Sequence, residues 1–243
     1  MKERLDKLLV DKGLVSSRER ARALILAGSV LVNDLVIDKA GTKVSAEAAV
    51  RLRGEDIPYV SRGGLKLAKA LEVFPVNIEN RTAIDVGAST GGFTDCLLQN
   101  KVARVFAVDV GYGQLAWSLR SDPRVVNLER TNIRKLKPCD LDELPDLAVI
   151  DASFISLEKV LPPTLDLLRR PAEIIALIKP QFEVGRGEVG KGGVVRNREQ
   201  HEQVKQRIRE FSCAIGCQVV DLVESPVTGP KGNVEFLIFL RCE

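Results

Sequence analysis

Two charged residues follow directly after two apolar runs in the second half of the chain. Asp151 follows LAVI, and Lys179 follows IIALI. Such runs, bounded by turn residues, are typical of buried strands in a parallel sheet. The carboxyl ends of neighbouring parallel strands line one crevice, so we expect the two side chains to face each other there. A single charge at a strand end is usually a solvated terminus or a cap, whereas two at one rim favour a catalytic pair.

A glycine-rich turn follows another apolar run, in the segment DVGASTGGFTDCLL. Gly87, Gly91 and Gly92 allow the backbone to turn tightly and to approach a ligand, and Thr94 lies near the start of the next helix. Ser89 stands where the dinucleotide fingerprint has the glycine that admits a pyrophosphate. The turn therefore predicts a cofactor without a diphosphate.

Two carboxylates complete this expected cofactor site. Asp109 ends VFAVD, about 20 residues after the turn, where a carboxylate accepts hydrogen bonds from ribose hydroxyls. Asp85 is placed to orient a charged amino-acid portion of the cofactor, directly or through water. The alternative is a plain turn, with Asp109 as a helix cap. The expected cofactor-binding residues are Asp85, Gly87, Ala88, Ser89, Gly91, Gly92, Phe93, Thr94, Asp109 and Asn132.

The segments that carry these residues alternate between strand and helix. Helical stretches separate several of the apolar runs, which indicates a parallel sheet with crossover helices. These runs are Ala83–Val86, Val105–Val108, Val125–Leu128, Leu147–Ile150 and Ile174–Ile178. After a helix around Arg198–Ile215, the runs Val219–Val223 and Glu235–Leu240 are joined by a loop too short for a crossover, so they should pair antiparallel. This layout predicts a Rossmann-like α/β fold of the methyltransferase type, not the dehydrogenase type.

A small α+β module precedes this domain. Residues 3–12 and 17–27 have the apolar spacing of amphipathic helices, and Ser16 with Glu19 forms a capping box. The short β-like runs that follow are Val30–Val32, Leu35–Ile37 and Ala49–Leu52, with a tight turn at Asn33-Asp34. The boundary near Asp56–Arg62 contains Pro58, and Gly63-Gly64 should interrupt any regular element. We therefore expect a first domain over 1–57, a linker over 58–64 and a second domain over 65–243.

Composition limits the class of protein. The 243 residues are 45% hydrophobic and 28% charged, as in a globular protein. No run of about 18 apolar residues is present and MKERLDKLL lacks a secretory signal, so we expect a soluble, cytoplasmic protein. The odd number of cysteines and the lack of C-x-x-C spacing predict reduced thiols and no metal site. The five cysteines are Cys96, Cys139, Cys213, Cys217 and Cys242. The single histidine, His201, lies in a polar run, which nearly excludes a histidine mechanism.

Five motifs, in this order, resemble the TlyA (haemolysin A) family: YVSRGGLKL, DVGASTGGFTD, DASFISL, LIKPQFE and NVEF. That family joins a module resembling ribosomal small-subunit protein four to an FtsJ-like methyltransferase domain. The resemblance covers essentially the whole chain, and implies transfer of a methyl group from S-adenosylmethionine to a ribose 2′-hydroxyl of ribosomal RNA. The sequence departs from the family at its linker, where Ile57-Pro58-Tyr59-Val60 stands in place of a segment with tryptophan.

The resemblance also assigns four catalytic residues. Carried over by motif, the Lys-Asp-Lys-Glu tetrad of FtsJ-like enzymes is Lys66, Asp151, Lys179 and Glu235. A lysine acts as a base only when burial or a neighbouring cation lowers its pKa. We expect Lys179 to be the base, Lys66 to supply the neighbouring charge, and the two carboxylates to orient Lys179. On sequence alone, Lys66 and Glu235 would be surface charges.

The expected RNA-binding residues lie mainly in the first module. Residues 1–22 contain seven basic and four acidic side chains, and Arg18 and Arg22 share a helix face suited to phosphates. A solvated helix face is the alternative, and the resemblance favours ribosomal RNA as the partner. The expected RNA-binding residues are Arg4, Lys7, Arg18, Arg22 and Arg62.

One further motif and two rival functions remain. GRGEVGKGG at 185–193 resembles the start of a P-loop, but Gly192 stands where a hydroxyl should bind magnesium. We expect it to be a mobile lid beside Lys179, with Arg186 and Lys191 available to phosphates. The rivals are a membrane-lytic protein, which needs an exposed amphipathic or spanning segment, and a non-catalytic RNA-binding protein with a vestigial fold. The matched tetrad argues against the second.

Overall fold

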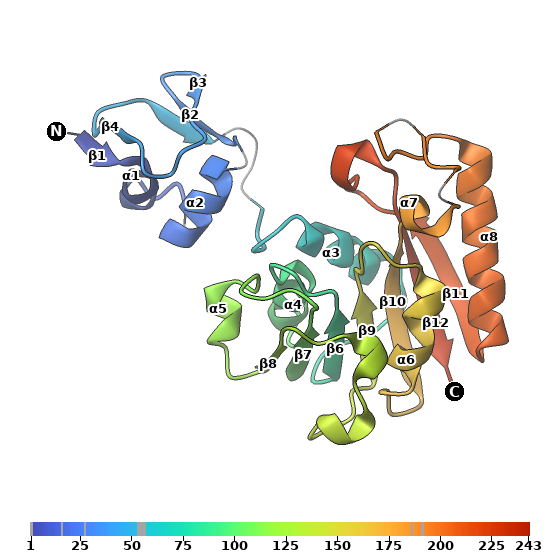
Figure 1. Cartoon of the computed structure of the whole chain (residues 1–243). Helices are drawn as coiled ribbons and strands as arrows, with labels where there is room; N and C mark the ends of the chain where they lie inside the picture. The colour runs from blue at the N-terminus through green and yellow to red at the C-terminus, as the bar shows by residue number, and fades with distance from the viewer. Residues whose placement is uncertain (1, 16, 27, 53–56, 186, 191) are drawn as a thin grey trace. The chain divides into compact units, whose positions relative to one another are not determined.

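The chain divides into two compact units, residues 1–58 and 59–243, each described here by itself (Figure 1). The computed structural model describes residues 2–15, 17–26, 28–52, 57–185, 187–190 and 192–243. Three features expected from the sequence therefore lie outside the described residues: the cap at Ser16, the domain boundary at Asp56, and the phosphate contacts of Arg186 and Lys191.

The first unit combines two helices with short antiparallel strands. Its apolar cluster includes Leu5, Leu9, Ala21 and Ile25, all fully buried, so the predicted amphipathic faces do pack together. The elements are β1 (Lys2–Arg4), α1 (Leu5–Asp11), α2 (Arg18–Leu26), β2 (Val30–Val32), β3 (Leu35–Val36), β4 (Lys43–Ser45) and β5 (Val50–Leu52). β2 lies between β3 and β5 in one sheet, and β1 pairs with β4.

β1 and β4 are the elements of this unit that the sequence did not predict. They pair only with each other, over three residues, and their sequences KER and KVS are too short and too polar to show an alternating pattern. The first helix consequently begins at Leu5 instead of residue 3. The expected tight turn is present, because Asn33 and Asp34 both have positive φ, as a two-residue hairpin turn requires.

The second unit is built on a seven-stranded sheet in the order β11-β12-β10-β9-β6-β7-β8. Its strands are β6 (Thr82–Val86), β7 (Arg104–Val108), β8 (Val125–Leu128), β9 (Leu147–Ile150), β10 (Ala172–Ile178), β11 (Cys217–Glu224) and β12 (Phe236–Cys242). The five strands from β10 to β8 are parallel to one another. β12 runs antiparallel to both β10 and β11. The predicted methyltransferase-type layout is confirmed.

Helices cover both faces of this sheet, since alternate residues of each strand enter different apolar clusters. Ile174 and Ile238 face α6 and α8, whereas Ile175 and Phe239 face α3 and α4. The helices are α3 (Gly63–Val73), α4 (Gly92–Gln99), α5 (Trp117–Arg120), α6 (Leu161–Leu165), α7 (Pro180–Glu183) and α8 (Arg198–Ala214), with 3-10 turns at η1 (Ile133–Lys135), η2 (Pro138–Asp140), η3 (Leu157–Lys159) and η4 (Pro230–Gly232). Because the strands are packed between helices on both faces, the positions of their carboxyl ends are fixed.

The start of α3 differs from the expectation that Gly63-Gly64 interrupts regular structure. α3 begins at Gly63, so both glycines are helical. A Cβ on Gly64 would lie 2.5 Å from the Cβ of Tyr59, so the glycine admits the tyrosine side chain against the helix. The pair of glycines therefore serves close packing, and it sets Lys66 in the first turn of α3.

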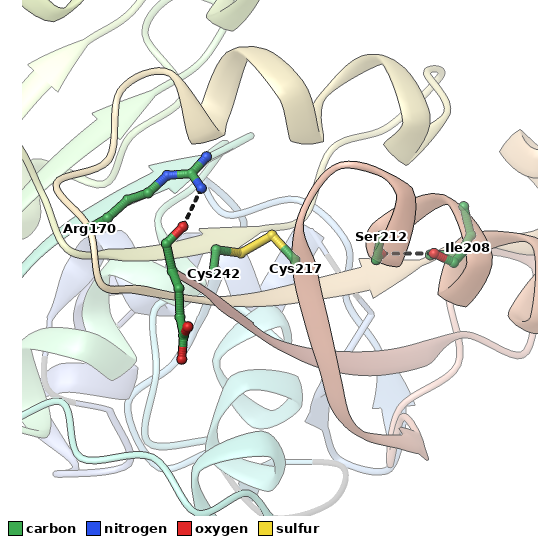
Figure 2. Close-up of a disulfide and its surroundings, with 6 residues drawn as sticks. Arg170, Ile208, Ser212, Cys217 and Cys242 are labelled. Carbon is green, nitrogen blue, oxygen red and sulfur yellow. Dashed lines mark hydrogen bonds between the residues drawn. A yellow bond between two sulfur atoms is a disulfide. The ribbon is translucent and has the colours of Figure 1, made fainter.

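The expectation of five reduced thiols is wrong for one pair. Cys217 and Cys242 form a disulfide between β11 and β12, where they are direct partners across the strands (Figure 2). Their Cα atoms are 4.3 Å apart although 25 residues separate them in sequence. The antiparallel register creates this proximity, and cysteine spacing alone does not reveal it. Among the described residues, Cys96, Cys139 and Cys213 are free.

Candidate active site

The glycine-rich turn joins β6 to α4 and approaches the end of β9 closely. Gly87 has φ +88°, and a Cβ on it would lie 2.9 Å from the carbonyl oxygen of Asp151. Gly91, with φ +96°, precedes the first residue of α4. Both positions favour glycine, one because of its conformation and its crowding, the other because of its left-handed conformation at a helix start. The turn thus packs closely against the backbone at the end of β9.

Asp109, which follows β7, stabilises this turn by hydrogen bonding. Its Oδ2 accepts a hydrogen bond from the backbone N–H of Ser89 at 2.8 Å, and its Oδ1 accepts one from Gly111 at 2.6 Å. A carboxylate has about four acceptor sites, so these two bonds leave capacity for a ligand. Asp109 and Asn132 line one hollow of about 480 Å³, where Asn132 also caps η1 by accepting from the N–H of Arg134.

Asp85 lies beneath the turn instead of at its surface. It is fully buried, and Thr94 donates a hydrogen bond to its Oδ2 at 2.7 Å. Burial raises the pKa of Asp85 to about 7, and the hydrogen bond from Thr94 opposes this shift. Asp85, Thr94 and Gly91 line neither this hollow nor the one beside it. Asp85 and Thr94 therefore support the turn from below, whereas Gly91 is part of the turn itself.

A second hollow, of about 360 Å³, adjoins the first. The two hollows share Gly87, Ser89, Asp151 and Ser153 in their walls. The second hollow is also lined by other residues expected for the cofactor, for catalysis and for RNA: Ala88, Gly92, Phe93, Lys66, Lys179 and Arg62. Residues assigned to different roles from sequence thus surround one connected space at the carboxyl ends of the strands.

Four ionic side chains form one continuous series of contacts at this place. Lys179 Nζ lies 2.5 Å from Asp151 Oδ1, and Lys66 Nζ lies 3.9 Å from Asp151 Oδ2. Lys66 Nζ also donates to Glu235 Oε2 at 2.6 Å. Lys66 and Lys179 are each 7% exposed and Glu235 is 1% exposed. Buried charges require partners, and each of these has one.

The pairing of Glu235 differs from the expectation that it orients Lys179. Its carboxylate contacts Lys66 on one oxygen and accepts from Gln181 Nε2 at 3.3 Å on the other. Asp151 is therefore the carboxylate that holds Lys179, and it also links the two lysines. This arrangement follows from β12 lying beside β10, which sets Glu235 opposite the first turn of α3.

Ser153 and Gln181 are contacts that sequence reasoning missed. Lys179 Nζ donates to Ser153 Oγ at 2.8 Å, so the ammonium group is held by the segment that follows Asp151. Both missed residues lie two positions after an identified residue, within DASF and KPQF. Their proximity in sequence was the available signal, but serine and glutamine are too common in loops for that signal to be specific.

Three of the four arginines expected to bind RNA converge on one buried carboxylate in the first unit. Asp6 is fully buried, and it accepts hydrogen bonds from Arg4 at 2.9 Å, Arg18 at 2.9 Å and Arg22 at 3.3 Å. The hydrogen bond from Arg4, followed by those from Arg18 and Arg22, holds the pKa of Asp6 well below its usual range. The three arginine side chains remain about half exposed. Lys7 pairs with Asp11 at 3.6 Å.

Two other sequence-based interpretations concern histidine and membranes. His201 is buried in α8, where its Nε2 lies 2.9 Å from the carbonyl oxygen of Val195 and its ring packs edge-on against Phe236. Over the described part of the chain, none of the helices combines the length and the apolar character needed to cross a bilayer.

Comparison with protein families divides the chain in the same way as its structure. An FtsJ-like methyltransferase model matches residues 59–242, and an S4 domain model matches residues 3–50. A 16S/23S rRNA (cytidine-2′-O)-methyltransferase TlyA from Mycobacterium tuberculosis is 46% identical over 241 residues, which is 99% of this chain and 90% of the relative. Hemolysin A from Brachyspira hyodysenteriae is 40% identical over 235 residues, covering 96% and 98% of the two chains.

Solved structures agree with this assignment. A candidate hemolysin from Streptococcus thermophilus superposes with a TM-score of 0.78 at 45% identity, covering 99% of this chain and 88% of that one. A SAM-dependent methyltransferase from Aquifex aeolicus, 20% identical, has a TM-score of 0.52 over 76% of this chain and 95% of its own, which supports the fold alone. Since family models match both units and relatives align along nearly its whole length, the chain belongs to the TlyA family of FtsJ-like methyltransferases.

Proposed function

We propose that the protein transfers a methyl group from S-adenosylmethionine to a ribose 2′-hydroxyl of ribosomal RNA. The observation that carries the proposal is the ionic series from Glu235 through Lys66 and Asp151 to Lys179, at the junction of two hollows. The relatives named TlyA from Mycobacterium tuberculosis and, at 35% identity over 182 residues, Campylobacter jejuni are both rRNA (cytidine-2′-O)-methyltransferases by name.

The first hollow fits the cofactor. Its volume of about 480 Å³ suits a small molecule, Gly87 and Ser89 of the turn line it, and Asp109 supplies acceptor oxygens for ribose hydroxyls. When bound, S-adenosylmethionine supplies an electrophilic methyl group on a sulfonium. We assign Asp109, Asn132 and Ser89 to the walls that hold it, with Asp85 supporting the turn from below.

The second hollow receives the RNA ribose. A ribose hydroxyl is a weak nucleophile, so it must lose its proton as it attacks. Lys179 Nζ takes that proton as a neutral amine, after its own ammonium proton has been released to solvent, and the Asp151 carboxylate, 2.5 Å away, stabilises the ammonium that forms again. Lys66 contributes positive charge beside the substrate backbone and is itself held by Glu235. Positioning of the hydroxyl in line with the methyl group supplies much of the acceleration.

The first unit supplies RNA affinity in this proposal. S4 domains are the family that matches residues 3–50, and the arginines around Asp6 keep half of their side-chain surface available for phosphates. Arg62, in the wall of the second hollow, supplies positive charge for a phosphate at the site of transfer itself.

Mapping the modified sugar tests the proposal. Unmethylated ribosomal particles are incubated with the protein and S-adenosylmethionine labelled in the methyl group, and the labelled nucleoside is identified by mass spectrometry. Label on a ribose 2′-oxygen is the expected result, and label on a base or no label contradicts it. Separate titration of S-adenosylmethionine by calorimetry distinguishes an enzyme from a vestigial fold, which would not bind it.

Lys179→Ala tests the assignment of the base. We expect methyl transfer to fall about 100-fold or more, because the substitution removes the group that takes the proton, while the cofactor dissociation constant changes little. Lys101→Ala is the matched control, since Lys101 is 75% exposed and pairs with Glu79 away from the site. Full transfer by Lys179→Ala would contradict the assignment.

The hemolysin names of two relatives favour one second candidate, membrane lysis. Leakage of dye from liposomes by the purified protein, without S-adenosylmethionine, would support it. Intact liposomes under conditions of full methyl transfer would exclude it at the concentrations tested.

A further inference from the structure

The short helix α7 directly follows Lys179 and contacts several parts of the site. Gln181 donates to Glu235, and the ring of Phe182 lies 5.0 Å from that of Phe154. The last residue of α7, Glu183, is nearly inaccessible, with a side chain 1% exposed. The proposed reaction assigns no role to Glu183.

Glu183 joins three segments that are distant in sequence. Its Oε2 accepts a hydrogen bond from Ser156 Oγ at 2.7 Å, and its Oε1 accepts one from the backbone N–H of Leu157 at 2.8 Å. Arg207, on α8, contacts Oε2 at 3.2 Å and donates to the backbone carbonyl of Glu183. The carboxylate therefore ties α7 both to the start of η3 and to α8.

The segment bound by Glu183 is the one that holds Lys179. It leaves β9 at Asp151, whose N–H donates to the carbonyl of Val86 at 3.0 Å, and it ends at the contacts with Glu183. Between these two anchors lie Ser153, which accepts from Lys179, and Phe154, whose φ of +65° is left-handed. A segment with a strained residue in its middle keeps its shape only when its ends are fixed.

Burial of a carboxylate is unfavourable unless its acceptor sites are occupied, and burial raises the pKa of Glu183. The acceptor sites of Glu183 are occupied by donors of the segment that begins at Asp151 and by Arg207 of α8. A shift of that segment would separate Asp151 and Ser153 from Lys179, because Lys179 is fixed to α7 through the chain itself.

We propose that Glu183 is a positioning residue for methyl transfer: it clamps the segment 151–157 to α7, and so sets the Asp151 and Ser153 oxygens against Lys179 Nζ. This inference rests on the proposed function for its catalytic consequence. The clamp itself is a property of the fold and can be measured independently.

Glu183→Gln is the informative substitution. Glutamine keeps an oxygen that can accept from the N–H of Leu157, but its NH₂ group cannot accept from Ser156, and its neutral amide no longer balances Arg207. We expect the single-turnover rate constant on unmethylated ribosomal RNA to fall about tenfold, since small misplacements of reacting groups are costly, with RNA affinity unchanged. Backbone amides of 151–157 should exchange faster with deuterium.

Glu158→Gln is the matched control. Glu158 Oε1 also pairs with Arg207, whose Nε lies 3.1 Å away. The substitution removes the same charge as Glu183→Gln, and it leaves both bonds between Glu183 and the segment 151–157 in place. It should leave the rate constant and the exchange of 151–157 as in the wild type. A merely stabilising role of Glu183 predicts a lower melting temperature for Glu183→Gln but an unchanged rate constant for the folded protein.

Ser156→Ala provides a second variant in case Glu183→Gln does not fold. It removes the bond from Ser156 to Glu183 and the capping bond that Ser156 accepts from the N–H of Glu158, but it leaves Glu183 bound to Leu157 and Arg207. A smaller loss of rate and a smaller gain in exchange are therefore expected. Equal rate constants and equal exchange in Ser156→Ala, Glu158→Gln and the wild type would overturn the proposal. If the wild type methylates no ribose, the proposed function fails, while the exchange of 151–157 still decides whether the clamp exists.

Discussion

Lys66 and Glu235 are 169 residues apart in sequence and 2.6 Å apart in the structure. Motifs identified both residues, but their partners depend on atomic positions that motifs do not carry. Asp85 illustrates the same limit, because the sequence placed it at the cofactor and the structure buries it beneath the turn with Thr94. A carboxyl group in such surroundings titrates far from its ordinary range.

Asp85 predicts a specific dependence of stability on pH. Burial raises its pKa to about 7, from an ordinary value near 4, so between these values the folded chain holds a proton that the unfolded chain has released. Its stabilising contribution is complete below about pH 4 and is lost as the pH rises through 7. We expect Asp85→Asn to lose less unfolding free energy than the wild type between pH 5 and pH 8, measured by urea denaturation.

The control for this experiment is Asp166→Asn, which removes an exposed carboxylate at the end of α6. Its unfolding free energy should depend on pH in the same way as that of the wild type. Parallel curves for Asp85→Asn and the wild type would contradict a raised pKa at Asp85.

At the scale of elements, the site depends on strand ends and on the two short segments beside them. The parallel strands β6, β9 and β10 end at one rim, and β12 is inserted antiparallel beside β10, which carries Glu235 to that rim. Apolar runs predicted these strands closely, because each is buried on both faces. α7, four residues long, was not predicted, since a single turn has no periodicity to detect.

The antiparallel pair β11 and β12 yields a prediction about thiols. With Cys217 and Cys242 joined, alkylation of the unfolded, unreduced protein should label Cys96, Cys139 and Cys213 alone, and prior reduction should expose both remaining cysteines. Intact-mass spectrometry counts the labels. Labelling of all five cysteines without reductant would restore the sequence-based expectation of reduced thiols.

At the scale of the whole molecule, two units with separate apolar cores divide the proposed tasks of RNA binding and methyl transfer. The basic residues of the first unit are organised by Asp6, which the local excess of positive charge did not predict. Three guanidinium groups around one carboxylate keep a net positive charge and hold the side chains in place for phosphates.

Substitution of these arginines should weaken RNA binding without affecting the cofactor. We expect Arg18→Gln with Arg22→Gln to lower affinity for ribosomal RNA and to reduce the slope of log affinity against log salt by about one for each phosphate that is no longer bound. Arg4 remains on Asp6 in this variant. Filter binding at several salt concentrations measures the slope, and calorimetry measures S-adenosylmethionine affinity.

Arg51→Gln is the matched control in the same unit, because Arg51 is 61% exposed and pairs with Asp34 on the hairpin turn. An equal loss of RNA affinity in both variants would show a general effect of charge and contradict a dedicated role for Arg18 and Arg22.

The fold class, the strands of the large sheet and the residue types at the site could be predicted from the sequence, because buried strands and glycine turns have local signatures and the motifs are specific. Four features depend on the folded structure and could not be predicted: the pairing of the charges, the burial of Asp85, the disulfide between Cys217 and Cys242, and the hydrogen bond from Ser156 to Glu183. Periodicity and turn chemistry act over a few residues, so they can be recognised in the sequence. Ion pairs and disulfides instead depend on register and packing between segments far apart in the chain.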